Sequence, residues 1–124
     1  MFSHQAYNVV HVVGIVALMA ALGGAALLAM VDPQRTNPGA RRLVAMLHGI
    51  GAFVVLLGGF GMLARLGIAG EGFPPWLWVK LLIWGVLALL LIVVRRRPNT
   101  ARTVLIGLPI LGGLAAYMAI YKPI

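Results

Sequence analysis

The residues with the clearest chemical potential are one lysine and two histidines set inside long apolar stretches: Lys80, His11 and His48. Ionisable groups inside such stretches are candidates for function, because an imidazole can exchange a proton or ligate a metal and an ammonium can bind an anion. Trp76 and Trp84 stand at i−4 and i+4 from the lysine, on the same helix face, where they favour cation–π contact. These residues are candidates for ligand binding, or for interfacial anchoring and hydrogen bonds between helices, rather than for covalent catalysis.

The two histidines are predicted at different depths. His11 lies about four residues into the first apolar run, and His48 about five residues into the second from the opposite side, on helices of roughly 36 Å. A haem held between them is therefore not expected, because two axial imidazoles must lie at matching depth on facing helices. Each histidine could still supply one ligand to a haem completed by another subunit, or hydrogen-bond across helices.

One end of the predicted bundle, its outer half, combines aromatic, imidazole and cationic groups. The candidate cofactor-binding residues there are His11, Lys80, Trp84, Arg65 and Tyr117, with His48 as a separate candidate on the inner side. Such groups around a partly apolar cleft suit a quinone headgroup, a lipid phosphate or a porphyrin carboxylate. The alternative is an ordinary interfacial belt, in which Lys80 snorkels roughly 7 Å to the membrane surface.

Several kinds of chemistry are excluded by what the chain lacks. Its single aspartate, Asp32, and single glutamate, Glu71, fall in different predicted loops, so no carboxylate pair is available for acid–base catalysis. With no cysteine there are no disulfides or thiolate sites. His4, His11 and Glu71 fall short of a convergent metal-binding set, so no metal site is predicted. No acidic residue lies within an apolar run, which disfavours a proton-coupled carrier.

The elements that must position these residues are four apolar runs, each long enough for a transmembrane helix. They cover approximately residues 7–31, 43–66, 75–94 and 103–121 of a single domain, 1–124. The fold class is therefore predicted as an all-α integral membrane protein. The formal charge of +8 sits in short blocks between the runs, so we expect a lipid bilayer and no nucleic acid as the partner.

The arginines predict the orientation. Seven of them, at 35, 41, 42, 95, 96, 97 and 102, fall in the first and third loops. By the positive-inside rule these loops are cytoplasmic, and both termini lie on the outer (periplasmic) side of a bacterial inner (cytoplasmic) membrane. Short loops then give an up-down-up-down four-helix bundle, multi-pass, whose first run is a retained span rather than a cleaved signal.

Small residues predict how the helices pack, because close backbone approach drives helix association in lipid. An alanine stripe marks the first run, at 17, 21, 25 and 29, and glycines mark the second, at 51, 58, 59 and 61. The fourth run has a Gly112-xxx-Ala116 pair. The third run is bulky, so we expect it to present more of its surface to lipid or to a partner.

The segments HGIGAFVVLLGGFGMLARLG (48–67) and WLWVKLLIWGVLALLLIVVRRRP (76–98), with Lys122-Pro123 at the end, carry a resemblance. A His-Gly early in the second run and W-x3-K opening the third make the chain similar to small four-helix inner-membrane proteins of the SirB and CopD groups and their uncharacterised relatives. The resemblance implies the fold and the membrane location. It associates CopD-like members with copper and a related family with haem and porphyrin oxidation, but the chain lacks their methionine–histidine clusters and matched histidine and acidic sets.

Two functions follow as predictions. The first is a non-catalytic integral subunit or assembly factor of a larger membrane complex, with other membrane subunits or further copies of the chain as partners and no enzymatic activity of its own. The alternative is a haem-, porphyrin- or quinone-binding membrane redox protein. Its site would lie in the outer half of the bundle, with His11, Lys80 and Trp84 as main contacts.

Overall fold

The computed structural model describes residues 3–66 and 74–121, except for the side chains of residues 4 and 63–66. It contains the long helices α1 (His4–Val31), α2 (Pro38–Leu66), α3 (Pro75–Arg96) and α4 (Ala101–Tyr121), with a short 3-10 helix, η2 (Pro98–Thr100), before α4. The described residues form no strand. All four long helices are long and apolar enough to cross a membrane. The predictions of an all-α fold and of a multi-pass membrane protein are confirmed as far as the number, length and apolar character of the described helices show.

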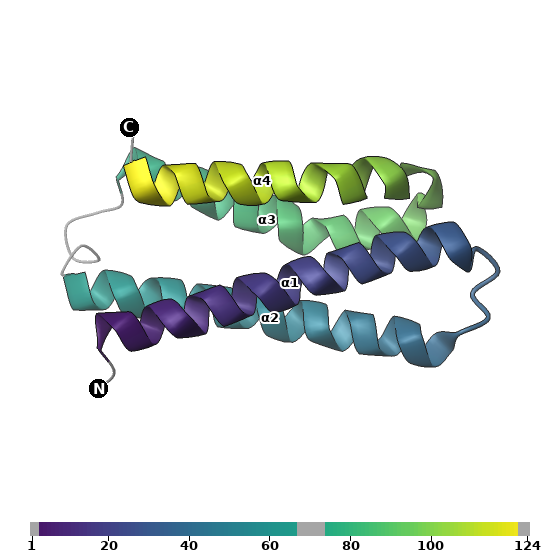
Figure 1. Cartoon of the computed structure of the whole chain (residues 1–124), viewed down its shortest axis with the longest axis horizontal. Helices are drawn as coiled ribbons and strands as arrows, with labels where there is room; N and C mark the ends of the chain where they lie inside the picture. Colours follow the sequence, from purple (N-terminus) through teal and green to yellow (C-terminus); the bar gives the residue numbers. More distant parts are fainter. Residues whose placement is uncertain (1–2, 67–73, 122–124) are drawn as a thin grey trace.

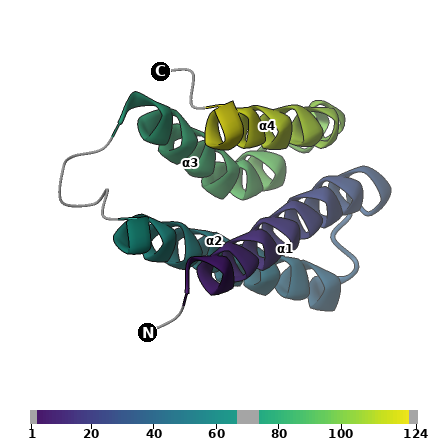
Figure 2. The ribbon, with the colours of Figure 1, turned by 60° about the vertical axis from the view of Figure 1, so that its left-hand side comes forward.

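The helices form two pairs. α1 packs along α2, α3 lies beside α4, and the two pairs face each other (Figures 1 and 2). The start of α1 and the end of α4 lie at one end of the molecule, here called the N-terminal end. The α1–α2 and α3–α4 connections lie at the other, here called the arginine end because Arg35, Arg41 and Arg95 meet there.

Polar caps explain why two helices begin earlier than the apolar runs suggest. The Ser3 side chain accepts a hydrogen bond from the Ala6 amide at 3.1 Å and starts α1. α2 begins at Pro38 rather than near residue 43, since the Asn37 side chain accepts from the Ala40 amide at 3.0 Å and proline suits the first helical position. Hydrophobicity marks the membrane-embedded part of a helix, whereas the caps mark its true ends.

Hydrogen bonds from arginine side chains join the two pairs at the arginine end. Arg35 Nη2 donates to the Arg95 carbonyl at 2.9 Å, and Arg95 Nη2 donates to the Arg41 carbonyl at 3.2 Å. Arg35 has a φ of 58°, in the left-handed region that disfavours residues with a side chain. The Arg35–Arg95 bond offsets this cost, so these arginines brace the loop as well as carry charge.

Asp32 organises the same loop. Its carboxylate accepts hydrogen bonds from the Thr36 hydroxyl at 2.6 Å, the Thr36 amide at 2.9 Å and the Asn37 amide at 3.1 Å. These bonds, the hydroxyl bond above all, hold the pKa of Asp32 below its ordinary value. The Arg41 guanidinium, 4.0 Å away, acts in the same direction.

Asp32 therefore predicts an acid-sensitive stability. Because its pKa is lower in the folded state, the carboxylate stabilises the fold above the unfolded-state pKa of about 3.9, and the contribution is lost as the pH falls through the folded value. We expect Asp32→Asn to unfold at a lower temperature at neutral pH and to lose less stability on acidification than the parent. Thermal unfolding in detergent between pH 3 and 7 measures both effects. Parallel curves for the parent and Asp32→Asn below pH 4 would contradict the assignment.

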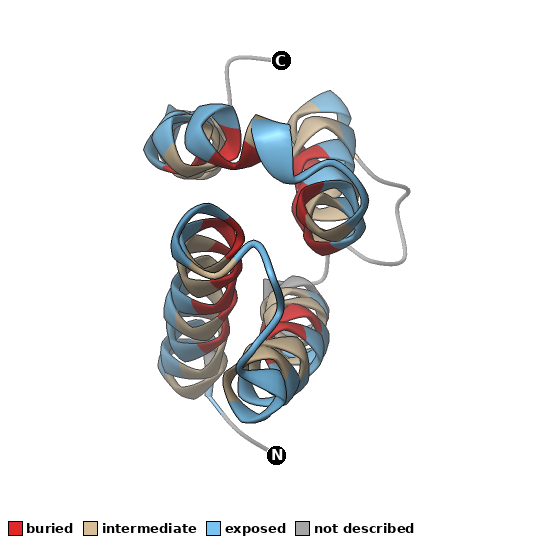
Figure 3. Ribbon diagram, turned by 90° about the vertical axis from the view of Figure 1, so that its right-hand side faces the viewer, coloured by how far each residue is buried: buried red, intermediate tan, exposed pale blue. Residues whose placement is uncertain are grey.

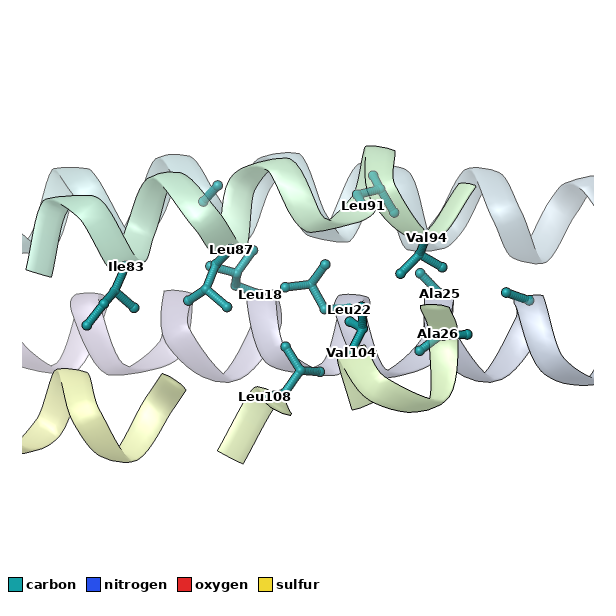
Figure 4. Packing of buried hydrophobic residues seen from close by; sticks show 13 residues of the cluster. Leu18, Leu22, Ala25, Ala26, Ile83, Leu87, Leu91, Val94, Val104 and Leu108 are labelled. Atoms are coloured by element: carbon teal, nitrogen blue, oxygen red, sulfur yellow. The ribbon is translucent and has the colours of Figure 1, made fainter. Parts of the chain in front are cut away.

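The core occupies the middle of the bundle and the arginine end. The buried residues face the space between the four helices (Figure 3). The largest fully buried side chains are Leu18 and Leu22 of α1 and Val94 of α3. Side chains of α1, α3 and α4 point toward one another there (Figure 4). This packed region fixes the relative positions of the two pairs at one end only.

The predicted packing over small residues is confirmed for α1 and α2. Ala21, Ala25 and Ala29 are buried in the core. At the α1–α2 crossing, a Cβ added to Gly51 would lie 2.8 Å from the Leu18 backbone nitrogen, and one added to Gly58 would lie 2.6 Å from that of His11. Real Cβ atoms do not approach backbone so closely, so glycine is required at these two positions.

The expectation that the third run exposes more of its surface than the others is wrong. In the described residues α3 buries Leu77, Ile83, Leu87, Leu91 and Val94, whereas α4 buries three residues, all in its first half. The bulky side chains of α3 fill the space between the pairs. A Cβ on Gly107 or Gly113 of α4 would meet nothing within 4 Å, so these glycines are not contact points.

Candidate functional site

A cavity of about 560 Å³ lies at the N-terminal end, between all four long helices. This volume is within the range of about 300–1,000 Å³ that is usual for small-molecule sites. Its walls are mainly aliphatic side chains, glycine and alanine. The polar groups on the described lining come from Asn8, His11, Trp76, Lys80 and Trp84. An apolar cavity with few polar groups suits a lipid-soluble ligand with one polar end.

The imidazole of His11 is held in a defined orientation. Its Nδ1 donates to the Val55 carbonyl of α2 at 2.8 Å, a bond between helices. A Cβ on Gly59 would lie 3.4 Å from Cε1 of the ring, so glycine leaves room for the imidazole beside α2. A carbonyl oxygen can only accept, so Nδ1 carries the proton, and in the neutral imidazole Nε2 then has the lone pair. A fixed histidine with a basic Nε2 is the form that ligates metals and accepts protons.

The only hydrogen-bond donor of the Trp84 indole is already used within the protein. Nε1 donates to the Ala52 carbonyl of α2 at 3.0 Å. The ring therefore offers the cavity its aromatic surface and no hydrogen bond. Lys80, half-buried one turn earlier on α3, supplies the positive charge of the lining, and no described lining residue is acidic.

Three of the predicted cofactor-binding residues, His11, Lys80 and Trp84, thus meet at one cavity. Tyr117 is not on the lining: its side chain is 47% exposed, and its ring packs against Tyr121 with centroids 5.1 Å apart. The Arg65 side chain lies outside the described residues, as do Glu71 and the side chain of His4.

His48 takes a different position. It is 8% exposed, and its Nε2 donates to the Leu87 carbonyl of α3 at 3.2 Å. Because α2 begins at Pro38, His48 lies about three turns into the helix, deeper than the apolar run indicated. It is not on the described lining of the cavity. The expected cross-helix hydrogen bond is confirmed, and the two histidines do not converge on one ligand.

The sequence interpretation missed the fourth wall of the cavity. Gly112, Ala115, Ala116 and Ala119 of α4 line it. The pattern of small residues was visible, but it was attributed to close helix contact. Here the small side chains leave space rather than remove it. Met19 and Met62 also line the cavity with His11, and their thioethers are soft ligands, although the sequence showed no methionine–histidine cluster.

The fold and the site together define a multi-pass helical membrane protein with a largely apolar cavity between its helices. Comparison of the chain with protein-family models, curated proteins and solved structures finds no match. Among the described residues no three histidine, aspartate or glutamate side chains lie close enough to hold a metal ion. The chemistry of the site must therefore be argued from its own residues.

Proposed function

We propose that the protein binds a ring-shaped, lipid-soluble cofactor of the haem, porphyrin or quinone class in this cavity. The observation that carries the proposal is the position of His11 and Lys80 on the lining of one largely apolar space. In a largely apolar cavity, the half-buried ammonium of Lys80 and the oriented imidazole of His11 are polar groups that a ligand can use. Apolar walls accept the ring, while the two polar groups orient it.

Each cofactor of this class would use the same residues. A haem would be held through its iron by Nε2 of His11, with the thioethers of Met19 and Met62 as further candidate ligands, and Lys80 would suit a propionate. The iron would supply one-electron chemistry. For a quinone, the two polar groups suit the ring oxygens, and the aliphatic walls suit the isoprenoid tail.

The proposal includes the membrane arrangement. The arginine end faces the cytoplasm of a bacterial inner membrane, the helices run up-down-up-down, and both termini and the cavity lie toward the outer side. The concentration of arginine in the first and third loops supports this orientation. It predicts that a cysteine introduced near position 3 is labelled by a membrane-impermeant thiol reagent added to intact cells. The cysteine introduced by Arg42→Cys should not be labelled.

The hypothesis that the protein is a subunit or assembly factor stays a prediction, and it concerns a protein partner rather than a ligand. It requires a stoichiometric membrane partner after gentle purification. The two hypotheses are compatible, since a subunit can hold a cofactor, but only the binding hypothesis requires the cavity.

The test is the composition of the protein purified in native lipids. We expect about one haem, porphyrin or quinone per chain, detected by the visible spectrum and by solvent extraction with chromatography. His11→Gln should lose or weaken the ligand, since its amide replaces the imidazole at the cavity. His48→Gln is the matched control, because the His48 side chain is not on the described lining of the cavity. A protein that purifies without any such ligand and takes up none on reconstitution would refute the proposal.

A further inference from the structure

We propose that the cavity binds a membrane quinone preferentially in its reduced, quinol form, with a ring hydroxyl donating a hydrogen bond to Nε2 of His11. This inference rests on the proposed function and names the ligand within the class. It follows from the hydrogen-bonding groups on the described lining. It concerns binding, and no electron transfer is assigned to the chain.

The first step is the protonation state of the His11 imidazole. Its Nδ1–H bond to the Val55 carbonyl, 2.8 Å long, leaves Nε2 as the acceptor of a neutral imidazole. The described lining contains Lys80 and no acidic residue. A neutral imidazole avoids a second positive charge in an apolar space. Among the polar groups on the lining, His11 therefore supplies a basic acceptor and Lys80 a cationic donor, beside the Asn8 amide and the indoles of Trp76 and Trp84.

The second step is the ligand that matches this pair. A quinol hydroxyl can donate to His11 and accept from Lys80, so the reduced ring satisfies both groups. The oxidised ring has only carbonyl oxygens, which accept from Lys80 but offer no donor to Nε2 of His11. An acceptor left unsatisfied in an apolar site costs free energy, so His11 distinguishes the two oxidation states, whereas Lys80 binds both.

The third step is the rest of the cavity. The Trp84 indole donates to the Ala52 carbonyl at 3.0 Å, so its ring can only pack against the ligand. Opposite helices supply Gly112, Ala115 and aliphatic side chains. Beyond its polar groups this lining suits a substituted ring with an apolar tail, and it offers no described cluster of cations for a strongly anionic headgroup.

The experiment measures the affinity of the full chain in phosphatidylcholine nanodiscs for decylubiquinone and for its reduced form, decylubiquinol. Quenching of tryptophan fluorescence reports binding, since Trp76 and Trp84 line the cavity. We expect the quinol to bind about tenfold more tightly than the quinone, as the loss of one hydrogen bond in an apolar site implies. His11→Phe should make the two affinities equal, and Lys80→Met should weaken both.

Two further variants keep the test sound if His11→Phe folds poorly. His11→Gln retains a donor for the Val55 carbonyl and an acceptor for the ligand, so it should restore part of the preference for quinol. Gly113→Ala, on the exposed side of α4 with nothing within 4 Å, should bind as the parent does. Equal affinity of the parent for both forms, or tighter binding of the quinone, would overturn the inference.

The remaining outcomes separate this inference from the proposed function. One haem per chain, with a Soret band that depends on His11 and no binding of either quinone form, would refute the quinol and leave cofactor binding intact. Failure to bind haem, porphyrin and both quinone forms would refute both. Selective binding of decylubiquinol that His11→Phe abolishes would support both.

Discussion

Gly58→Ala is expected to lower the free energy of unfolding by about 1–3 kcal/mol, although alanine is intrinsically the better helix former. The added Cβ would lie 2.6 Å from the backbone nitrogen and 2.7 Å from the Cα of His11. Backbone atoms cannot rotate away as a side chain can, so α1 and α2 must separate. In lipid, close packing is a main source of helix association, so the lost contacts are not replaced by a hydrophobic driving force.

The matched control is Gly49→Ala on the same helix. A Cβ at that position would meet nothing within 4 Å, so this variant should be as stable as the parent or slightly more stable. Reversible unfolding in mixed micelles, with helicity followed by circular dichroism, gives both values. Equal stabilities for Gly58→Ala and Gly49→Ala would show that the crossing is looser than described. The substitution should also weaken ligand binding, since His11 is the residue it displaces.

Much of the fold could be predicted from the sequence because lipid imposes a simple rule on it. A stretch that crosses a bilayer must satisfy its backbone internally, so four long apolar runs predict four helices. The close approach of α1 and α2 was visible in the alanine stripe ending at Ala29 and in Gly51 and Gly58, since packing in lipid depends on small residues. His11, Lys80 and Trp84 were identifiable because polar and aromatic groups are uncommon in such runs.

Which face of each helix is buried in the bundle could not be predicted in the same way. In a helix that is apolar on every side, hydrophobic periodicity does not distinguish buried from lipid-facing residues. The bulky α3 was therefore expected at the periphery, although Ile83 and Leu87 fill the core. The bonds from His11, His48 and Trp84 all end on backbone carbonyls, which every residue has, so the sequence indicates the donors but not their acceptors.

The cavity was the least predictable feature, because it results largely from the small side chains of α4. Gly112 and Ala115 of α4 could have brought two helices together, as Gly58 does. Instead the arginine end and the core set the separation of the pairs, and the small residues at the N-terminal end leave unfilled volume. The same residue type thus closes one interface and opens another, depending on what fixes the helix axes.

This argument predicts that Ala115→Leu abolishes ligand binding without harming the fold. The added carbons would occupy apolar space in the cavity, so stability should be unchanged or higher, since filling a cavity commonly stabilises a protein. The ligand would lose the same space, and its affinity should fall more than tenfold, which corresponds to at least about 1.4 kcal/mol.

The contrast between the stability and the affinity of this variant is the measurement that matters. Gly113→Leu is the control, because it adds a larger side chain to the same helix at an exposed position with nothing within 4 Å and should leave both quantities as in the parent. Unfolding midpoints and ligand titrations on the same preparations give the stability and the affinity of each variant.

Unimpaired binding by a stable Ala115→Leu would mean that the ligand occupies another site. Lost binding together with lost stability would mean that α4 packs more tightly than the cavity implies. Only a stable protein that no longer binds would identify this space, which His11 and Lys80 also line, as the site where the ligand is held.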